Sequence, residues 1–238
     1  MSQDVHDMTH TNQLRRASAE FLGTGALVAI VVGSGIAAAR LSTDPGLRLL
    51  ENSVATALGL AALILLFGPV SGAHFNPVIS LADAVLRRRD GLKPAELVLY
   101  VIAQLAGGIG GALLANAMFE VPAAISTHDR AGAGTLLGEV VATAGLTLLI
   151  AGMVRASQSL LAIAIAVGGY IGAAYWFTSS TSFANPAVTL GRVFSDTFAG
   201  ISPLSASAFV AAQLVGAIIG ILLTAALFSR PAAPEEIS

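Results

Sequence analysis

The chain contains no cysteine and very little charge, and both shortages narrow its class. Without cysteine among its 238 residues, the chain forms no disulfide, no thiolate metal site and no thiol redox switch. Charged residues make up 11% of the chain and apolar residues 55%, whereas soluble domains carry about 25% charged residues. A net charge of −2 gives no reason to expect a nucleic-acid partner. No hydrolytic or redox constellation is present, so we predict neither an enzyme nor a cofactor or metal site.

The few charges also leave long windows empty. Five windows carry no charged residue, and a sixth carries only Glu139. The windows are Phe21–Ala39, Val54–Val70, Leu97–Phe119, Gly132–Val154, Leu160–Phe177 and Pro203–Phe228. Because a helix needs about 20 apolar residues to cross a hydrocarbon core of roughly 30 Å, the sequence predicts an all-α membrane protein with six spanning helices.

The distribution of Lys and Arg predicts the orientation. Cytoplasmic loops carry the excess of these residues, and placing the N-terminus inside gives eight on the cytoplasmic side against four outside. The eight are Arg15, Arg16, Arg87, Arg88, Arg89, Lys93, Arg155 and Arg230, and the four are Arg40, Arg48, Arg130 and Arg192. We therefore expect residues 1–13 and 230–238 to be cytoplasmic tails and residues 14–229 to be one membrane domain.

The membrane domain contains a duplication. Tyr100–Phe119 and Phe209–Phe228 are identical at eleven of twenty positions, at an offset of 109 residues, where roughly two or three identities would arise by chance in so Ala- and Leu-rich a chain. The repeats cover about 14–120 and about 131–229. Each contains three spans, an odd number, so the second copy enters the membrane from the opposite face. The arrangement is an inverted 3+3 repeat.

Glutamates mark the first span of each repeat. Glu20 matches Glu139 at an offset of 119 residues, ten more than the offset between the other matched segments. We assign the ten additional residues to a longer first loop, Leu41–Leu49.

Two Asn-Pro steps, in "SGAHFNPVIS" and "FANPAVT", are separated by the same 109 residues. Asparagine is a favoured helix N-cap and proline a favoured first helical residue, so Asn76-Pro77 and Asn185-Pro186 each predict a helix start. A helix from Pro77 to about Arg87 would be roughly 16 Å long, about half the membrane. The sequence therefore predicts two re-entrant half-helices that meet N-terminus to N-terminus near the midplane.

The segments that lead into these helices, Ser71–Phe75 and Ser179–Ala184, are predicted to be irregular at membrane depth. Such backbone is tolerated only where it is buried in protein or lines a wet cavity. Its carbonyls would offer acceptors, the two Asn amides would offer donors, and the positive ends of two helix dipoles would converge. Such a path suits neutral polar solutes and repels cations and protons.

With these features the chain resembles the major intrinsic protein family, the aquaporins and aquaglyceroporins, over nearly all of residues 15–229. The resemblance implies a pore within each subunit, a homotetramer, and a location in the plasma membrane, in a bacterium the inner membrane, with both termini cytoplasmic. It also implies that two Asn-Pro boxes line the pore, which here are Asn76, Pro77, Val78, Asn185, Pro186 and Ala187.

The resemblance further implies a selectivity filter, which maps onto Thr56, Ala173, Ser182 and Val188. Typical members have arginine at the position of Val188 and bulky aromatic or His residues at the two helix positions. All four residues here are small, so we predict a wide filter without arginine. The role of Arg192, one turn beyond Val188, stays open. This pattern is similar to that of bacterial members associated with arsenic resistance, which suggests water, glycerol-like polyols, arsenous acid or methylated arsenicals as solutes.

Five further residues are predicted to support the two loops. Glu20 and Glu139 could form a proton relay, but accepting hydrogen bonds from unpaired N–H groups of the re-entrant loops is the favoured interpretation. His74 could sense pH, but a structural role near the cytoplasmic vestibule is favoured. Gln104 and Gln213 are expected to fix loop backbone.

Three alternatives compete with a wide passive channel. A strict water channel would share the fold. A secondary transporter also uses inverted repeats and broken helices, but outside the two Glu no intramembrane charge is left for a coupling site. A structural membrane protein with a closed pore would leave the polar re-entrant loops without a purpose.

Overall fold

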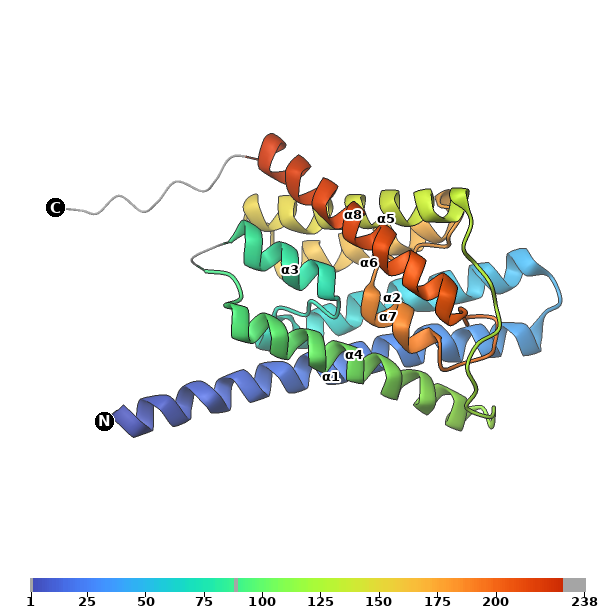
Figure 1. Cartoon of the computed structure of the whole chain (residues 1–238), viewed down its shortest axis with the longest axis horizontal. Coiled ribbons are helices and arrows are strands. Elements are labelled where there is room, and N and C mark those ends of the chain that lie inside the picture. Colours follow the sequence, from blue (N-terminus) through green and yellow to red (C-terminus); the bar gives the residue numbers. More distant parts are fainter. Residues whose placement is uncertain (1, 88–89, 229–238) are drawn as a thin grey trace.

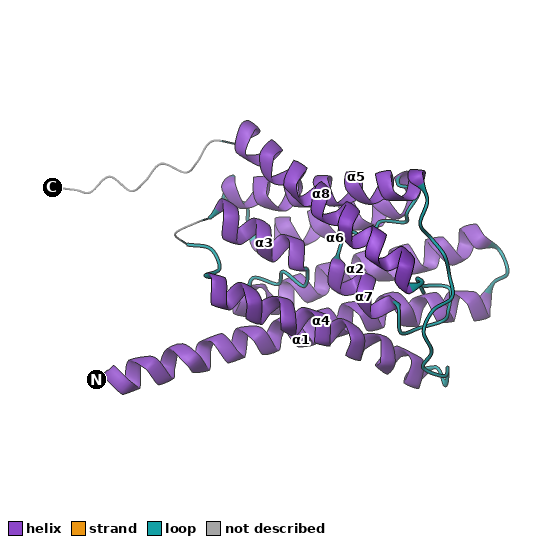
Figure 2. Ribbon diagram, viewed as in Figure 1, coloured by secondary structure: helices purple, strands orange, loops and turns teal. Residues whose placement is uncertain are grey.

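The computed structural model describes residues 2–87 and 90–228, with side chains from Thr11 onward. The predicted tail 230–238 and the residues Arg88, Arg89 and Arg230 lie outside the described residues. Eight helices follow one another, and no strand occurs among the described residues (Figures 1 and 2). They are α1 (Ser2–Leu41), α2 (Pro45–Ser71), α3 (Pro77–Leu86), α4 (Pro94–Met118), α5 (Ala133–Arg155), α6 (Leu160–Phe177), α7 (Pro186–Arg192) and α8 (Pro203–Leu227).

Six of the described helices, α1, α2, α4, α5, α6 and α8, are long and apolar enough to span a membrane, as predicted. Large apolar side chains such as Leu58 and Leu222 are exposed on the outside of the bundle. A contiguous apolar surface of this kind is unsuited to water and suited to lipid. The six charge-free or nearly charge-free windows therefore identified the spans correctly.

The segment predicted as an N-terminal tail is helical from Ser2 and continues into the first span. The expectation of a long first loop is wrong, because α1 continues to Leu41 and α2 begins at Pro45. Asp44 caps α2 by accepting a hydrogen bond from the N–H of Leu47 at 2.8 Å. The additional residues of the first repeat therefore lengthen its helices.

The two short helices α3 and α7 have 10 and 7 residues and begin at the two Asn-Pro steps. Asn76 accepts a hydrogen bond from the N–H of Val78, and Asn185 accepts from those of Ala187 and Val188. Both predicted helix starts are confirmed. From the centre of the bundle, α3 runs toward the end at which α1 begins and α8 ends (Figure 1). We call this end the α3 end and the opposite one the α7 end.

Helix packing repeats in the two halves. The long helix pairs are α1 with α4 and α5 with α8, which cross closely along their length (Figure 1). Glycines make the close approach possible: a Cβ at Gly111 would lie 2.1 Å from the carbonyl oxygen of Gly25, and one at Gly220 would lie 2.7 Å from that of Ala144. These glycines therefore serve packing within the chain.

Candidate functional site: a cavity between two half-helices

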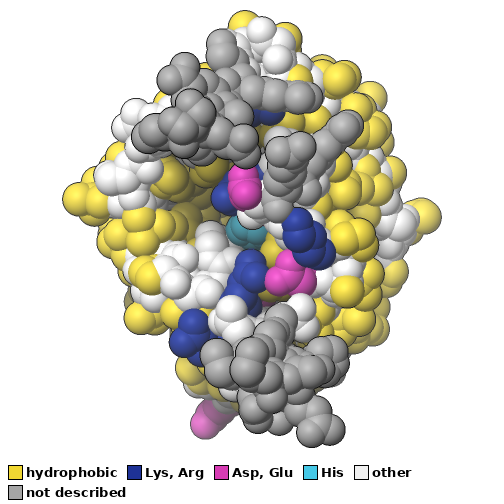
Figure 3. Space-filling view, turned by 90° about the vertical axis from the view of Figure 1, so that its left-hand side faces the viewer, with side chains coloured by type: hydrophobic (Ala, Val, Ile, Leu, Met, Phe, Trp, Pro, Cys, Tyr) yellow, Lys and Arg dark blue, Asp and Glu magenta, His cyan; other side chains and the backbone are white. Residues whose placement is uncertain are grey.

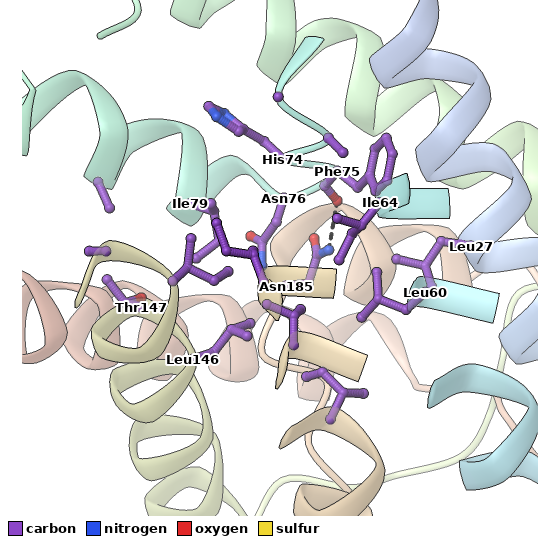
Figure 4. Close-up of a pocket in the computed structure, with 18 of the residues that line it drawn as sticks. Leu27, Leu60, Ile64, His74, Phe75, Asn76, Ile79, Leu146, Thr147 and Asn185 are labelled. Atoms are coloured by element: carbon purple, nitrogen blue, oxygen red, sulfur yellow. Dashed lines mark hydrogen bonds between the residues drawn. The ribbon is translucent and has the colours of Figure 1, made fainter. Parts of the chain in front are cut away.

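The side-chain amides of Asn76 and Asn185 connect the two half-helices at the centre of the bundle. The Nδ2 of Asn76 donates to the carbonyl of Ala184 at 2.8 Å, and the Nδ2 of Asn185 donates to that of Phe75 at 2.7 Å. Figure 4 shows the two amides side by side on the cavity. Because each NH₂ group has two donors, each amide keeps a second N–H for a molecule in the cavity.

The loops leading into α3 and α7 share an unusual backbone. Positive φ angles occur at Gly72, Ala73 and Phe75 in the first loop, and at Thr181, Ser182 and Ala184 in the second. Each residue of the second set follows its counterpart by 109 positions. A non-glycine residue in this region costs about 1–3 kcal/mol. The surroundings must therefore hold both loops in place.

Glu20 holds the first loop. Its Oε1 accepts hydrogen bonds from the Ser71 hydroxyl at 2.6 Å and the His74 N–H at 3.0 Å. Its Oε2 accepts from the Phe75 N–H at 2.7 Å and from the Gln104 amide at 2.8 Å. The side chain has no exposed surface and does not border the cavity. This geometry favours the loop-support interpretation over a proton relay.

Glu139 repeats the arrangement in the second half. It accepts from the N–H groups of Phe183 and Ala184, both at 2.9 Å, and from the Gln213 amide at 2.6 Å. Like Glu20, it is fully buried and lies off the cavity.

We expected the two glutamines to bind loop backbone, but their amides bind side chains instead. Gln104 bridges Glu20 to the hydroxyl of Ser80 on α3 at 2.9 Å, and Gln213 bridges Glu139 to the hydroxyl of Thr189 on α7 at 2.8 Å. The glutamines therefore link each carboxylate to its own half-helix. Sequence reasoning missed Ser80 and Thr189, although their 109-residue offset could have identified them.

A cavity of about 240 Å³ lies along the two Asn residues. One wall is apolar, and Figure 4 shows its side chains pointing inward toward the amides. The wall includes Leu27, Leu60, Ile64, Ile79 and Leu146. Thr147 and Ser182 also line the cavity, but their hydroxyl oxygens are buried and have no hydrogen-bond partner among the described residues. The lining thus combines an apolar wall with the two Asn amides. Pro77, Val78, Pro186 and Ala187 do not line it.

The mouth at the α3 end is polar. His74, Asp83, Arg87 and Arg155 border the cavity there, and Figure 3 shows basic, acidic and histidine side chains around a hollow at this end. Nδ1 of His74 lies 3.1 Å from the Ser80 hydroxyl, which fits the structural role favoured for this residue. Asp83 binds Arg87 at 3.0 Å.

The part of the cavity toward the α7 end corrects the predicted filter. Thr56, Ser182 and Val188 border it, but Ala173 faces outward and is exposed. Tyr175 borders the cavity from the same helix, α6, and its hydroxyl lies 3.1 Å from that of Thr56. Tyr175 lies two positions after Ala173 on the helix, roughly 200° around its axis, which puts the two side chains on opposite faces.

The structure also locates Arg192, whose role the sequence left open. Arg192 borders the cavity one turn beyond Val188 and is 3% exposed. The lining at the α7 end therefore contains the aromatic side chains of Tyr175 and Phe183 and the basic side chain of Arg192 besides the three small residues.

Comparison with known proteins agrees with this architecture. The family model described as Major intrinsic protein matches residues 7–156 and 132–237. The chain is 48% identical over 221 residues to the aquaglyceroporin AqpS of Rhizobium meliloti strain 1021, covering 92% of each chain. It is 32% identical over 235 residues to aquaporin Z of Brucella melitensis, covering 91% of this chain and 99% of that one.

Among solved structures, the aquaglyceroporin from Plasmodium falciparum matches with a TM-score of 0.69 at 20% identity. The match covers 89% of this chain and 93% of that one. At this identity the likeness concerns the fold alone, and the fold is the bundle with two half-helices described above. The chain belongs to the major intrinsic protein family.

Proposed function

We propose that this chain is a passive channel for water and small uncharged solutes, which cross a membrane through the cavity between the half-helices. The observation that carries the proposal is the pair of Asn amides, which bridge the opposing loops and still offer one N–H each to the cavity. Similarity to an aquaglyceroporin and to an aquaporin supports the same function.

We further propose that solutes larger than water pass. The apolar wall of Leu27, Leu60 and Leu146 suits the carbon side of a polyol, and the second N–H of each Asn amide suits its OH groups. Because α2 and α6 are neighbours, the contact between Tyr175 and Thr56 holds the Tyr175 ring along the wall. Glycerol, urea and undissociated arsenous acid are candidate solutes, and methylated arsenicals extend the series.

A strict water channel is the second candidate. Tyr175 and Arg192 both border the cavity, and two large side chains toward the α7 end would narrow the path to the width of water. Flux of glycerol distinguishes the two candidates, since a strict water channel passes none.

Stopped-flow light scattering of proteoliposomes tests the proposal, with water, glycerol, urea and arsenous acid measured in one preparation. A channel gives fast flux that does not saturate with solute concentration. Saturating flux would indicate a transporter, and flux equal to that of empty liposomes would indicate a closed structural protein.

Two substitutions on α5 provide a matched pair for this experiment. Leu146→Trp fills the cavity and should abolish flux, whereas Leu137→Trp adds the same group at a side chain that is 63% exposed on the outside. Equal flux through both variants would contradict the assignment of the cavity as the path.

We propose the bacterial inner membrane as the location, with both termini in the cytoplasm. Arg15, Arg16, Arg87 and Arg155 all lie at the α3 end (Figure 1), and the positive-inside rule places such an end in the cytoplasm. Cysteine-accessibility labelling tests this directly, because the natural chain has no cysteine. A cysteine at residue 2 should react only after the membrane is permeabilised.

The homotetramer also remains a proposal. Each chain encloses its own cavity, so the proposed path does not depend on assembly. Light scattering of the protein in mild detergent should give four times the mass of one chain, 24.0 kDa. A monomeric mass with full flux after reconstitution would contradict the tetramer and leave the channel intact.

A further inference from the structure

Arg192 occupies an unusual place at the α7 end of the cavity. It is the last residue of α7, four positions after Val188, so its side chain emerges about 6 Å farther along the helix axis. The side chain is 3% exposed and borders the cavity together with Tyr175 and Ser182. The carbonyl end of a helix favours a cation, which fits a basic residue at this point.

Neutral groups of the protein hold the guanidinium in position. Its Cζ lies 3.4 Å from the centre of the Phe183 ring, and its Nε donates to the carbonyl of Ala199. Arg130 approaches the same ring at 5.5 Å and donates to the carbonyls of Phe198 and Gly200. Unlike Arg192, Arg130 does not border the cavity.

Arg192 forms no ion pair among the described residues, since no carboxylate there lies within 4.0 Å of its nitrogens. The two terminal nitrogens also have no protein acceptor in the described part of the chain. Burying an unpaired charge costs several kcal/mol unless polar groups or water compensate. The free donors of Arg192 therefore depend on molecules in the cavity.

The first half shows how the same position is neutralised. The counterpart of Arg192 at the 109-residue offset is Asp83, and that of Asp196 is Arg87. Asp83 and Arg87 form an ion pair at 3.0 Å. In the second half the helix ends at Arg192, and Asp196 binds Thr127 instead, at 2.8 Å from its N–H. The two residues of the second pair are separated, so Arg192 keeps a charge without an ion-pair partner in the described part of the chain.

We propose that Arg192 is a specificity-determining residue of this channel, which repels cations and donates hydrogen bonds to passing solutes. It acts one helical turn beyond Val188, so the lining at Val188 itself stays uncharged. The inference rests on the proposed function as a channel for neutral solutes. It assigns cation exclusion to Arg192, although the resemblance would place an arginine at Val188.

Proteoliposomes reconstituted with Arg192→Met test the proposal, because methionine retains the length of the side chain without the charge. Potassium and proton leak, measured with a potential-sensitive and a pH-sensitive dye, should rise about tenfold over the natural chain. Arg192→Lys should restore exclusion because it restores the charge. Arg130→Met is the matched control, since it removes the other arginine on the Phe183 ring, and its leak should stay at the natural level.

Water flux and the elution volume in detergent show whether each variant is folded. Unchanged leak in a folded Arg192→Met that still conducts water would overturn the proposal and leave the channel function intact. An equal leak in Arg130→Met would also overturn it, by showing a general effect of charge or packing. The proposed function fails separately, if the natural chain itself passes no water and no glycerol.

The double variant Arg192→Met/Val188→Arg sharpens the assignment to one position. It moves the arginine one turn inward. Cation leak should return to the natural level, because a fixed charge again borders the path, while glycerol flux should fall about tenfold. A double variant that leaks as much as Arg192→Met would show that exclusion does not depend on a charge in the cavity, and would contradict the proposal.

Discussion

The two halves of the molecule are alike where they hold the loops and different where they face the cavity. Glu20 and Glu139 bind the same two backbone N–H positions, and each carboxylate is tied by a glutamine to its own half-helix. Left-handed backbone recurs at matched positions in both loops. The interactions that support the two loops are therefore duplicated.

The residues around these loop supports have diverged between the two halves. His74 and Tyr100 of the first half correspond to Phe183 and Phe209 of the second at the 109-residue offset. Tyr100 donates to the carbonyl of Ser71 at 2.8 Å and receives a hydrogen bond from Arg16 at 3.0 Å. The second half instead packs Phe183 against Phe209 and two arginines. The two halves therefore share the support of the loops and differ in the side chains packed around it.

Replacing either glutamate should have the largest effect on folding and flux, and the effect should be equal in the two halves. In Glu20→Gln or Glu139→Gln, one acceptor oxygen becomes an NH₂ group that faces buried donors. Each buried donor left unsatisfied costs about 1–3 kcal/mol, and the strained loop backbone loses its support. We expect the folded yield to collapse and flux to fall to the level of empty liposomes.

The matched control is Glu120→Gln, an exposed position in a loop. Size-exclusion profiles and stopped-flow rates provide the measurement. If one glutamate variant folds and conducts normally while the other fails, the two glutamates do not support their loops equally, which would contradict the equivalence of the two halves.

Replacing a glycine at a helix crossing should have the next largest effect, a loss of stability that is larger in the first half. A Cβ at Gly111 would lie 2.1 Å from a backbone oxygen, whereas the nearest atom to one at Gly220 lies 2.6 Å away, on the side chain of Thr147. Gly111→Ala should therefore cost about 1–3 kcal/mol by overpacking, and Gly220→Ala less. Thermal unfolding in detergent measures the difference.

Gly110 offers the control on the same helix. Nothing lies within 4 Å of a Cβ there, so Gly110→Ala should be neutral or stabilise the helix by up to about 1 kcal/mol. A loss at Gly110 as large as that at Gly111 would attribute the effect to helix propensity and would contradict the packing argument.

Much of this scaffold could be predicted from the sequence because its signals are local. Absence of charge over about 20 residues identifies a span, and Asn followed by Pro identifies a helix start. The same reasoning should have found the start of α2, where Asp44 precedes Pro45. Matching positions across the repeat placed Glu20 and Glu139 correctly beside the loops.

The lining could not be predicted in the same way because it depends on helix rotation. Spacing from the Asn-Pro step selected Ala173, whereas packing between α2 and α6 turns Tyr175 toward the cavity. The direction of Arg192 follows from the end of α7 at that residue and from the ring of Phe183. Both facts concern contacts between segments distant in sequence, which spacing alone does not encode.

Val188→Arg should change selectivity more than total flux. Val188 borders the cavity at 5% exposure, and its first-half counterpart at the 109-residue offset is Ile79, which also borders it. Arginine at this level adds bulk and a second charge beside Arg192, so glycerol flux should fall about tenfold, equivalent to about 1.4 kcal/mol, and water flux less. Stopped-flow measurements of both solutes give the ratio.

Val188→Ile is the control for that ratio, because it matches the first half and adds bulk without charge. It should lower glycerol flux only slightly. Equal losses of water and glycerol in Val188→Arg would indicate a general block of the path and would contradict selectivity at this level.

The loop acid Asp196 should give the smallest effect, which also depends on pH. The backbone N–H of Thr127 lowers the pKa of Asp196 below its ordinary value, with smaller contributions from the Thr127 hydroxyl and from His128. A lowered pKa in the folded chain means that the carboxylate stabilises the fold above its unfolded pKa of about 3.9. This contribution is lost as pH falls through the folded pKa.

Asp196→Asn should therefore lower the melting temperature slightly at pH 7 and not at all below the folded pKa, where the natural side chain is also neutral. Thr127→Val should retain most of the difference, since it leaves the backbone N–H in place. Arg87, the counterpart of Asp196, instead pairs with Asp83. A constant gap between Asp196→Asn and the natural chain from pH 7 to pH 3 would show that the carboxylate does not stabilise the loop through its charge.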